Sequence, residues 1–244
     1  MKTYFIGWDV GAWYCDKNTK SRDALYIIDD KGNYRGEFRG NLKNGKPGKL
    51  GGILEESSSK YFIQKCFDLC QTNLKFSGKA ILAIDAPLGF PSPLITLLTK
   101  NKFSETVNDN FRENDYLFRY TEQKLNADNS NYKPLSTINH MIGAQSTKAI
   151  HLIAKLGLKN NKKGVWENEN LTVLETYPAI ARTKHADEMR VRKTSDVDDA
   201  QICAEVAVQF FEDLNRSYDP NRLNYPDEKT DDMIRIASEG WIFY

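Results

Sequence analysis

Short runs of apolar residues near the start of the chain predict β-strands. The first three runs cover residues 3–10, 24–29 and 33–40, and the turn sequence DDKGN lies between the second and the third. These runs are rich in aromatic and β-branched residues, which favour strands, whereas Gly, Asn and Asp favour turns. We therefore expect a three-strand antiparallel meander at this end of the protein.

Further along the chain, helical and strand-like patterns alternate. Apolar residues at helical spacing predict helices over 53–74, 136–157 and 197–214. Continuous apolar runs over 79–87 and 171–178 predict parallel strands that are buried on both faces. Gly157 is expected to end the second helix, and the final EGWIFY predicts one more short strand. Parallel strands joined by helices indicate the α/β class.

Residues 91–135 interrupt this alternation. They are charged and rich in Asn, with Pro93 and Pro134 near the two ends. We expect an insertion with one or two short helices. A chain of 244 residues with 40% hydrophobic and 27% charged residues is typical of a soluble globular protein. We treat 1–244 as a single domain that contains the insertion.

Composition and charge narrow the classes of function. No apolar run approaches the roughly 18 residues of a membrane span, and the short apolar stretch at the N-terminus carries Asp9 and lacks a cleavage site, so we expect a cytoplasmic protein. The net charge of +1 does not indicate a nucleic-acid partner. Cys66 and Cys70 lack the second pair that a zinc site needs, and we expect core cysteines. The remaining cysteines and the histidines have no partner at metal-ligand spacing in the sequence: Cys15, Cys203, His140, His151 and His185.

Acidic residues end three of the predicted buried strands. Asp9 ends TYFIGWD, Asp85 ends KAILAID, and Glu175 ends LTVLE. A carboxylate at the end of a buried strand is costly unless something pairs with it. Asp196 and Asp199 lie three residues apart, on one face of a predicted helix. Convergence of the strand ends on this helix start predicts a shared cation.

Each acid also has a structural alternative. Asp9 and Asp85 could cap the turns that follow their strands, and Glu175 could pair with a neighbouring cation instead of binding metal. Asp196 could be an N-cap, because the helix dipole favours acids in a first turn. Asp198 is expected to be a solvated first-turn acid.

The chemistry that suits clustered carboxylates is phosphodiester hydrolysis. Two divalent cations about 3.5–4 Å apart can hold a scissile phosphate, activate water and stabilise the leaving oxygen. Mg²⁺ prefers oxygen ligands, so such a site needs carboxylates from several elements. The acids at these strand ends and helix start therefore predict a site for Mg²⁺ or Mn²⁺.

The motifs GWDVG, AIDAPLGFP, FRYTE, ETYPA, DVDDAQICA and EGWI follow one another in this order. The ordered set resembles an uncharacterised family of predicted nucleases with an RNase H-like fold (domain of unknown function family 429), and the resemblance runs from Asp9 to Trp241. Asp196 to Ala200 is also similar to the DxxDA helix start of Holliday-junction resolvases. Ser195 departs from the family pattern, which often has a basic residue or His there.

The resemblance implies an RNase H-like mixed sheet, a three-strand antiparallel meander plus parallel strands, flanked by helices and carrying a helical insertion. It implies metal ligands at Asp9, Asp85 and Asp199, with Asp196 and Glu175 as further catalytic acids. It also places Arg119 near the site, where a bidentate contact could hold phosphate.

Other basic residues are candidates for substrate binding. Arg112 and Arg119 both lie in the stretch FRENDYLFRYTE of the insertion, and both could instead form salt bridges. Lys184 belongs to a basic segment that could hold a nucleic-acid backbone or be a solvated surface. The full candidate set in that segment is Arg182, Lys184, Arg190, Arg192 and Lys193, and the loop Lys43, Lys46 and Lys49 is a similar case.

We therefore predict a Mg²⁺- or Mn²⁺-dependent nuclease or phosphodiesterase, with a nucleic acid or nucleotide as substrate. One alternative is an ATP-binding phosphotransferase of the actin-like or sugar-kinase type. The chain is short for the duplicated domains of that class and lacks its glycine-rich adenosine loop. Another alternative is a catalytically silent nucleic-acid-binding protein. The sequence contains no GxxxxGK[ST], GxGxxG or GxSxG motif at a suitable place.

Overall fold

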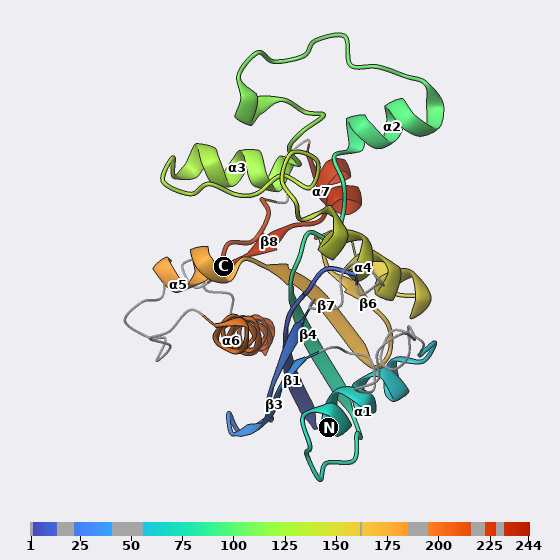
Figure 1. Cartoon of the computed structure of the whole chain (residues 1–244), viewed down its shortest axis with the longest axis vertical. Coiled ribbons are helices and arrows are strands. Elements are labelled where there is room, and N and C mark those ends of the chain that lie inside the picture. Colours follow the sequence, from blue (N-terminus) through green and yellow to red (C-terminus); the bar gives the residue numbers. More distant parts are fainter. Residues whose placement is uncertain are drawn as a thin grey trace.

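The computed structural model describes residues 2–13, 22–40, 56–161, 163–184, 195–215, 223–227 and 232–244. Within these residues the protein is α/β, with one mixed sheet that has helices on both faces (Figure 1). The strands are β1 Thr3–Asp9, β2 Asp23–Ile28, β3 Tyr34–Gly40, β4 Lys79–Asp85, β5 Lys159–Asn160, β6 Trp166–Glu167, β7 Leu171–Thr176 and β8 Ile242–Phe243.

The sheet combines an antiparallel and a parallel half. Its strand order is β3-β2-β1-β4-β7-β6-β5, and β8 pairs with β7. The predicted meander is confirmed, because β1 pairs antiparallel with β2 and β2 with β3. The predicted parallel strands are confirmed as well, since β4 runs parallel to both β1 and β7. The central strands therefore end at the same edge of the sheet.

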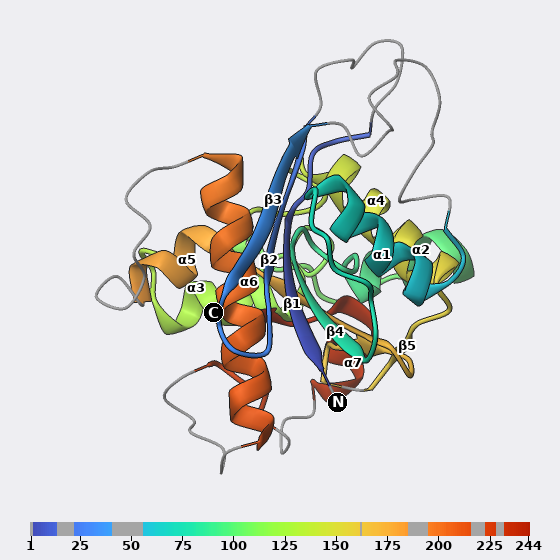
Figure 2. The ribbon, with the colours of Figure 1, turned by 90° about the horizontal axis from the view of Figure 1, so that it is seen from below.

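The helices are α1 Ser59–Leu69, α2 Ser92–Lys100, the 3₁₀ helix η2 Phe111–Glu113, α3 Tyr120–Asp128, α4 Gly143–Lys155, α5 Pro178–Lys184, α6 Asp196–Asn215 and α7 Met233–Glu239. The long α6 covers one face of the sheet, and α1 and α4 lie on the other (Figure 2). Among the described residues, no helix combines the length and the apolar character needed to cross a membrane.

Side chains of β1 alternate between two hydrophobic cores. Ile6 and Trp8 pack in the core under α1 and α4, whereas Phe5 packs in the core under α6. This alternation follows from the two-residue period of a strand. Both faces are covered, which explains why the central strands appear as continuous apolar runs. The expected core cysteines belong to these cores: Cys66, Cys70 and Cys203 are free and buried, and Cys15 lies outside the described residues.

Gly7 allows α6 to lie directly on β1. A Cβ atom at this position would lie 1.8 Å from the carbonyl oxygen of Ala200 and 2.5 Å from the amide nitrogen of Ala204. Both are main-chain atoms of α6, so no side-chain rotation could relieve the clash. The close contact brings the beginning of α6 toward the end of β1.

The segment 91–135 carries α2, η2 and α3, in line with the expected short helices. The helix predicted over 136–157 is wrong at its start, because α4 begins at Gly143. The preceding residues form turns in which Ser136 Oγ accepts from the main-chain N–H groups of Ile138 and Asn139. Its end is as predicted: Gly157 follows with a φ of +63°, which favours glycine.

Other helix bounds also differ from the sequence-based ranges. The helix predicted over 53–74 is α1, which ends at Leu69, and residues 53–55 lie outside the described residues. The helix predicted over 197–214 is α6, one residue longer at each end. The hairpin of β5 and β6 and the helices α5 and α7 were not predicted.

Candidate functional site

Asp9 and Asp85 form an acidic pair at the edge of the sheet. They are the last residues of β1 and β4 and are register partners in the parallel ladder. Neighbouring strands lie about 4.8 Å apart, so the two carboxylates start from adjacent backbone positions. No described residue donates a hydrogen bond to either carboxylate. Two acids are thus placed side by side without a hydrogen-bond donor, although the charge of Arg39 acts on Asp9 and opposes the rise in its pKa.

The surroundings of this pair favour protonation or a bound cation. Burial raises the pKa of Asp9 to about 7, and the nearby Asp199 and Asp196 add to the increase. Burial also raises the pKa of Asp85 well above its usual range, with further contributions from Asp9, Asp199 and Glu175. A positive ion between the two carboxylates would offset both their burial and their repulsion.

Asp199 and Asp196 lie in the first turn of α6, and each contacts an arginine. Asp199 Oδ1 accepts a hydrogen bond of 2.6 Å from Arg182 of α5. Asp196 Oδ2 accepts one of 2.7 Å from Arg39 of β3, in a pair exposed to solvent. Burial is the main cause of the raised pKa of Asp199, and Arg182 opposes it. Both acids act electrostatically on Asp9, so the structure brings them to the same edge.

Ser195, rather than Asp196, caps α6. The main-chain N–H of Asp198 donates to Ser195 Oγ over 3.3 Å, and the main-chain N–H of Ser195 donates to Asp198 Oδ2 over 2.9 Å. This reciprocal pair is a capping box. Asp198 lies in the first turn, as expected, and its contacts with Ser195 are exposed; the S-x-x-D spacing of this capping box was visible in the sequence.

Glu175 pairs with Arg119 in the interior. Arg119 is completely buried at the start of α3, and Glu175 is buried in β7. Glu175 Oε1 accepts from Nη2 over 2.6 Å, and Oε2 accepts from Nη1 over 2.8 Å and from the main-chain N–H of Leu88 over 2.9 Å. Of the two roles considered for Glu175, the structure shows the ion pair.

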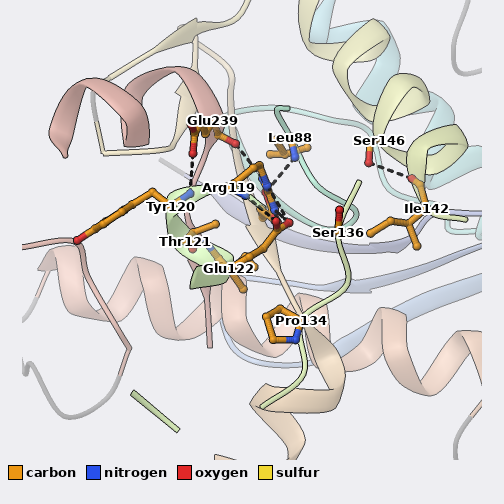
Figure 3. A network of polar contacts seen from close by, with 12 residues as sticks. Leu88, Arg119, Tyr120, Thr121, Glu122, Pro134, Ser136, Ile142, Ser146 and Glu239 are labelled. Atoms are coloured by element: carbon orange, nitrogen blue, oxygen red, sulfur yellow. Dashed lines mark hydrogen bonds and ion pairs between the residues drawn. The ribbon is translucent and has the colours of Figure 1, made fainter. Parts of the chain in front are cut away.

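Every N–H group of the Arg119 guanidinium has an acceptor within the protein. Besides Glu175, Nε and Nη2 contact Glu122 Oε1, both at 2.9 Å, and Nη1 donates to the main-chain oxygen of Glu239 over 2.8 Å. A guanidinium has five such groups, so none is left for a phosphate. Arg119 instead ties α3 to β7 through Glu175 and to the end of α7 through Glu239; Figure 3 shows Arg119 between Glu122 and Glu239.

Arg112 and Lys184 occupy more open positions. Arg112 Nη1 donates to the main-chain oxygen of Pro134 over 2.7 Å, and its guanidinium lies 5.2 Å from the centre of the Phe118 ring. Lys184 Nζ lies 4.8 Å from the centre of the Tyr244 ring, and burial lowers the pKa of this lysine. The other basic candidates and His185 lie outside the described residues: Lys43, Lys46, Lys49, Arg190, Arg192 and Lys193.

The two remaining histidines have ordinary structural contacts. His140 Nδ1 accepts from the main-chain N–H of Ser136 over 2.9 Å. The ring of His151 lies edge-on to Trp13, with 5.7 Å between the ring centres.

A buried ion pair beside the acidic pair was not predicted. Lys148 Nζ of α4 donates to both carboxylate oxygens of Asp23, over 2.6 and 2.7 Å. Trp8 Nε1 and the main-chain N–H of Gly11 also donate to Asp23, over 2.9 and 3.0 Å. The sequence signal was a lysine one turn before Leu152 on the apolar face of a helix. This pair fixes α4 to the chain on both sides of Asp9.

A cavity of about 160 Å³ opens beside the acidic pair. Asp9, Asp85 and the residues that follow them form one part of its wall. The ends of β7 and β8, the start of α3, the segment around Pro134 and the start of α4 form the rest. The lining residues are Asp9, Val10, Asp85, Ala86, Pro87, Arg119, Glu122, Pro134, Leu135, Ile142, Gln145, Glu175, Thr176, Tyr177 and Ile242.

The described residues contain no group of three His, Cys, Asp or Glu side chains arranged to hold a metal ion. Glu175 is occupied by Arg119, and Asp199 contacts Arg182. The acidic pair nevertheless suits Mg²⁺, which retains several waters and commonly takes only one or two protein carboxylates together with substrate phosphates.

Comparison with known proteins gives no match for this chain. No protein-family model matches the sequence, no curated protein matches it, and no solved structure matches its fold. The function must therefore be argued from the geometry and chemistry of the site itself.

Proposed function

We propose that this protein is a Mg²⁺- or Mn²⁺-dependent hydrolase of nucleic-acid phosphodiester bonds, built on an RNase H-like fold. The observation that carries the proposal is the pairing of Asp9 with Asp85 at the ends of adjacent parallel strands, where neither carboxylate accepts a hydrogen bond from a described residue. Unpaired, partly buried acids are costly, and a divalent cation is the partner that their chemistry favours.

The sheet supports the fold assignment. An antiparallel meander β3-β2-β1 continues into the parallel strands β4 and β7, and α6 packs across β1, β4 and β2. This is the layout that the sequence motifs imply. It places the acids of β1, β4 and α6 at one edge, which is where ligands bind in sheets with parallel strands.

The residues take different roles in the proposed reaction. Asp9 and Asp85 bind the cation, and Asp199 is the third proposed ligand through its Oδ2, since Oδ1 contacts Arg182. When bound there, Mg²⁺ or Mn²⁺ supplies a water of lowered pKa and stabilises charge on the phosphate oxygens. Arg182 orients Asp199 within the site.

The remaining candidates act around this centre. Asp196 adds negative charge near Asp9 and is held by Arg39. Arg112 and Lys184 are the proposed contacts to the nucleic-acid backbone, because their side chains are less buried than Arg119. Arg119 and Glu175 hold the insertion against the sheet and so support the site.

Two other functions fit the site less well. An ATP-binding phosphotransferase would need room for a nucleotide, and ligand pockets typically measure about 300–1,000 Å³, against about 160 Å³ here. A silent nucleic-acid-binding protein would gain nothing from unpaired carboxylates, which repel a polyanion unless a cation lies between them.

The test is hydrolysis by protein stripped of metal. Bis(4-nitrophenyl) phosphate and labelled DNA and RNA oligonucleotides, single- and double-stranded, are incubated with Mg²⁺, Mn²⁺ or EDTA. We expect cleavage of at least one substrate with Mg²⁺ or Mn²⁺ and none with EDTA. Asp85→Asn should lower the rate by more than about 100-fold, since losing even an outer partner of a metal ligand typically costs about 10–100-fold.

Asp68→Asn is the matched control, because Asp68 is an exposed acid of α1. This variant should keep the wild-type rate. Cleavage that persists in EDTA, or in the Asp85→Asn variant, would contradict the proposal. Failure of every substrate with both metals would favour the binding protein instead.

A further inference from the structure

The cavity beside the acidic pair has walls unlike those of a phosphate site. Apart from the acids, much of its lining is apolar or aromatic, with Pro87, Pro134, Leu135, Ile142 and Tyr177. Tyr177 lines the same cavity as Asp9 and Asp85. An aromatic ring thus lies close to the acidic pair, within an otherwise apolar surface.

Apart from Asp9 and Asp85, the charged residues of the lining contact one another. Arg119 contacts both Glu122 and Glu175, and all its N–H groups have acceptors. The cavity therefore offers no free cation to an anionic group. An uncharged, largely apolar ligand fits its interior better than a phosphate does.

Gln145 supplies the polar feature of this cavity. It lies in the first turn of α4, and its Oε1 is buried and has no hydrogen-bond partner. A buried amide oxygen without a donor is unfavourable, so a ligand that donates to it would be stabilised. The terminal amide of glutamine carries an acceptor oxygen and a donor NH₂ group, and rotation of the amide exchanges their positions. It can therefore match the edge of a nucleobase that presents a donor and an acceptor side by side.

The position of Gln145 is fixed by its helix. Lys148, three residues later on the same face of α4, forms the buried pair with Asp23. Asp23 is also bound to the N–H of Trp8, the neighbour of Asp9. The amide of Gln145 and the carboxylate of Asp9 are thus held by one set of contacts, as two parts of a common binding surface would need.

We propose that this cavity receives one unpaired nucleobase of the substrate, with Gln145 hydrogen bonding to its edge and Tyr177 contacting its ring. This inference rests on the proposed function, because it places the neighbouring phosphodiester at Asp9 and Asp85. A volume of about 160 Å³ is below the roughly 300–1,000 Å³ of pockets for larger ligands, so the cavity suits one ring system. The substrate is accordingly single-stranded, or its base leaves the duplex.

Binding of nucleosides, which carry no phosphate, tests the cavity directly. Adenosine, guanosine, cytidine, uridine and thymidine are titrated into the metal-free protein and followed by saturation-transfer NMR. At least one should bind to the wild type, and Gln145→Met should weaken it at least about fivefold, since one discriminating base contact typically has this effect or a larger one. Gln123→Met, in α3 and outside the cavity lining, is the control and should bind as the wild type does.

A second variant covers the case in which Gln145→Met does not fold. Leu135→Trp fills the cavity from its rim, where Leu135 is 38% exposed, so the core stays intact. It should also weaken nucleoside binding. Absence of binding by all five nucleosides, or equal binding by the wild type and the folded variants, would overturn the proposal.

Abasic substitution separates this inference from the proposed function. One abasic residue is moved stepwise through a cleaved single-stranded oligonucleotide, and kcat/KM is measured with Mn²⁺. One position next to the cut should lower kcat/KM at least about tenfold, within the range seen when base stacking is lost. Metal-dependent cleavage that ignores every abasic residue would overturn the base cavity and leave the hydrolase standing. Nucleoside binding that depends on Gln145, without any metal-dependent cleavage, would overturn the hydrolase and leave the base cavity standing.

Discussion

Asp9 and Asp85 are register partners at the ends of β1 and β4, and neither carboxylate accepts a hydrogen bond from a described residue. Their neighbours are held differently, since Glu175 is bound by Arg119 and Asp199 by Arg182. The sheet edge therefore combines two free acids with acids that the protein itself has neutralised. This contrast separates the residues proposed to bind a cation from those that support them.

The pH dependence of stability should reveal the free acids. Burial raises the pKa of Asp9 from 3.8 to about 7, so the folded protein holds this proton more tightly than the unfolded chain. The stabilisation is complete below pH 3.8 and is lost as the pH rises to about 7. Without metal, Asp9→Asn should be more stable than the wild type at pH 8, by roughly 2–4 kcal/mol.

Urea denaturation in EDTA at pH 5 and pH 8 measures this difference. The gap between Asp9→Asn and the wild type should widen from the lower to the higher pH. Asp68→Asn, an exposed acid of α1, should follow the wild type at both. An Asp9→Asn variant that is less stable than the wild type at pH 8 would show that Asp9 is a structural cap.

Arg119→Lys tests whether this residue holds the fold or the substrate. Lysine has three donors on a compact charge and cannot serve the acceptors that surround the guanidinium. Breaking a buried ion pair typically costs about 3–5 kcal/mol, and we expect a loss of that order in the free energy of unfolding. Arg35→Lys, at a pair in which Arg35 is 41% exposed and Asp29 is buried, should cost less than Arg119→Lys, whose pair is buried on both sides.

Denaturation and steady-state kinetics together decide this case. A structural Arg119 predicts a loss of stability with or without metal. If Arg119→Lys kept the wild-type stability and only KM rose, the residue would contact substrate, as the family resemblance implies.

Gly7→Ala tests how the close approach of α6 shapes the site. The new Cβ would lie 1.8 Å from the main-chain oxygen of Ala200, so α6 must move. Overpacking of this kind costs about 1–3 kcal/mol. Asp199 moves with α6, so metal-dependent activity at a temperature where the variant is folded should fall as well.

The control for this substitution is Gly143→Ala at the start of α4, where the nearest atom would lie 3.1 Å away. Its stability should stay within about 1 kcal/mol of the wild type, because alanine is preferred over glycine in helices. Wild-type stability and activity in Gly7→Ala would show that the contact between β1 and α6 does not position the acids.

The central part of this fold could be predicted because its signals are local. Continuous apolar runs that end in Asp9 and Asp85 identify buried parallel strands, and parallel neighbours end at one edge. The helix of Asp196 and Asp199 was evident from its amphipathic pattern. Proximity of the acids follows from these features without any knowledge of side-chain contacts.

The pairing of the acids could not be predicted in the same way. Glu175 and Arg119 are 56 residues apart, and their contact depends on how the insertion folds over the sheet. The two-residue strands β5 and β6 are too short for a recognisable alternation. The start of α4 was placed too early because Ser136 bonds its own turn, a competition with the helix that residue periodicity does not show.

Anomalous diffraction from crystals soaked in Mn²⁺ tests the central claim most directly. We predict a manganese peak about 2.0–2.5 Å from carboxylate oxygens of both Asp9 and Asp85, with Asp199 or water completing the ligand set. Crystals of Asp85→Asn soaked in the same way should lose this peak. A wild-type protein in which manganese binds elsewhere, while both carboxylates keep no ligand, would contradict the proposed metal site and the hydrolase built on it.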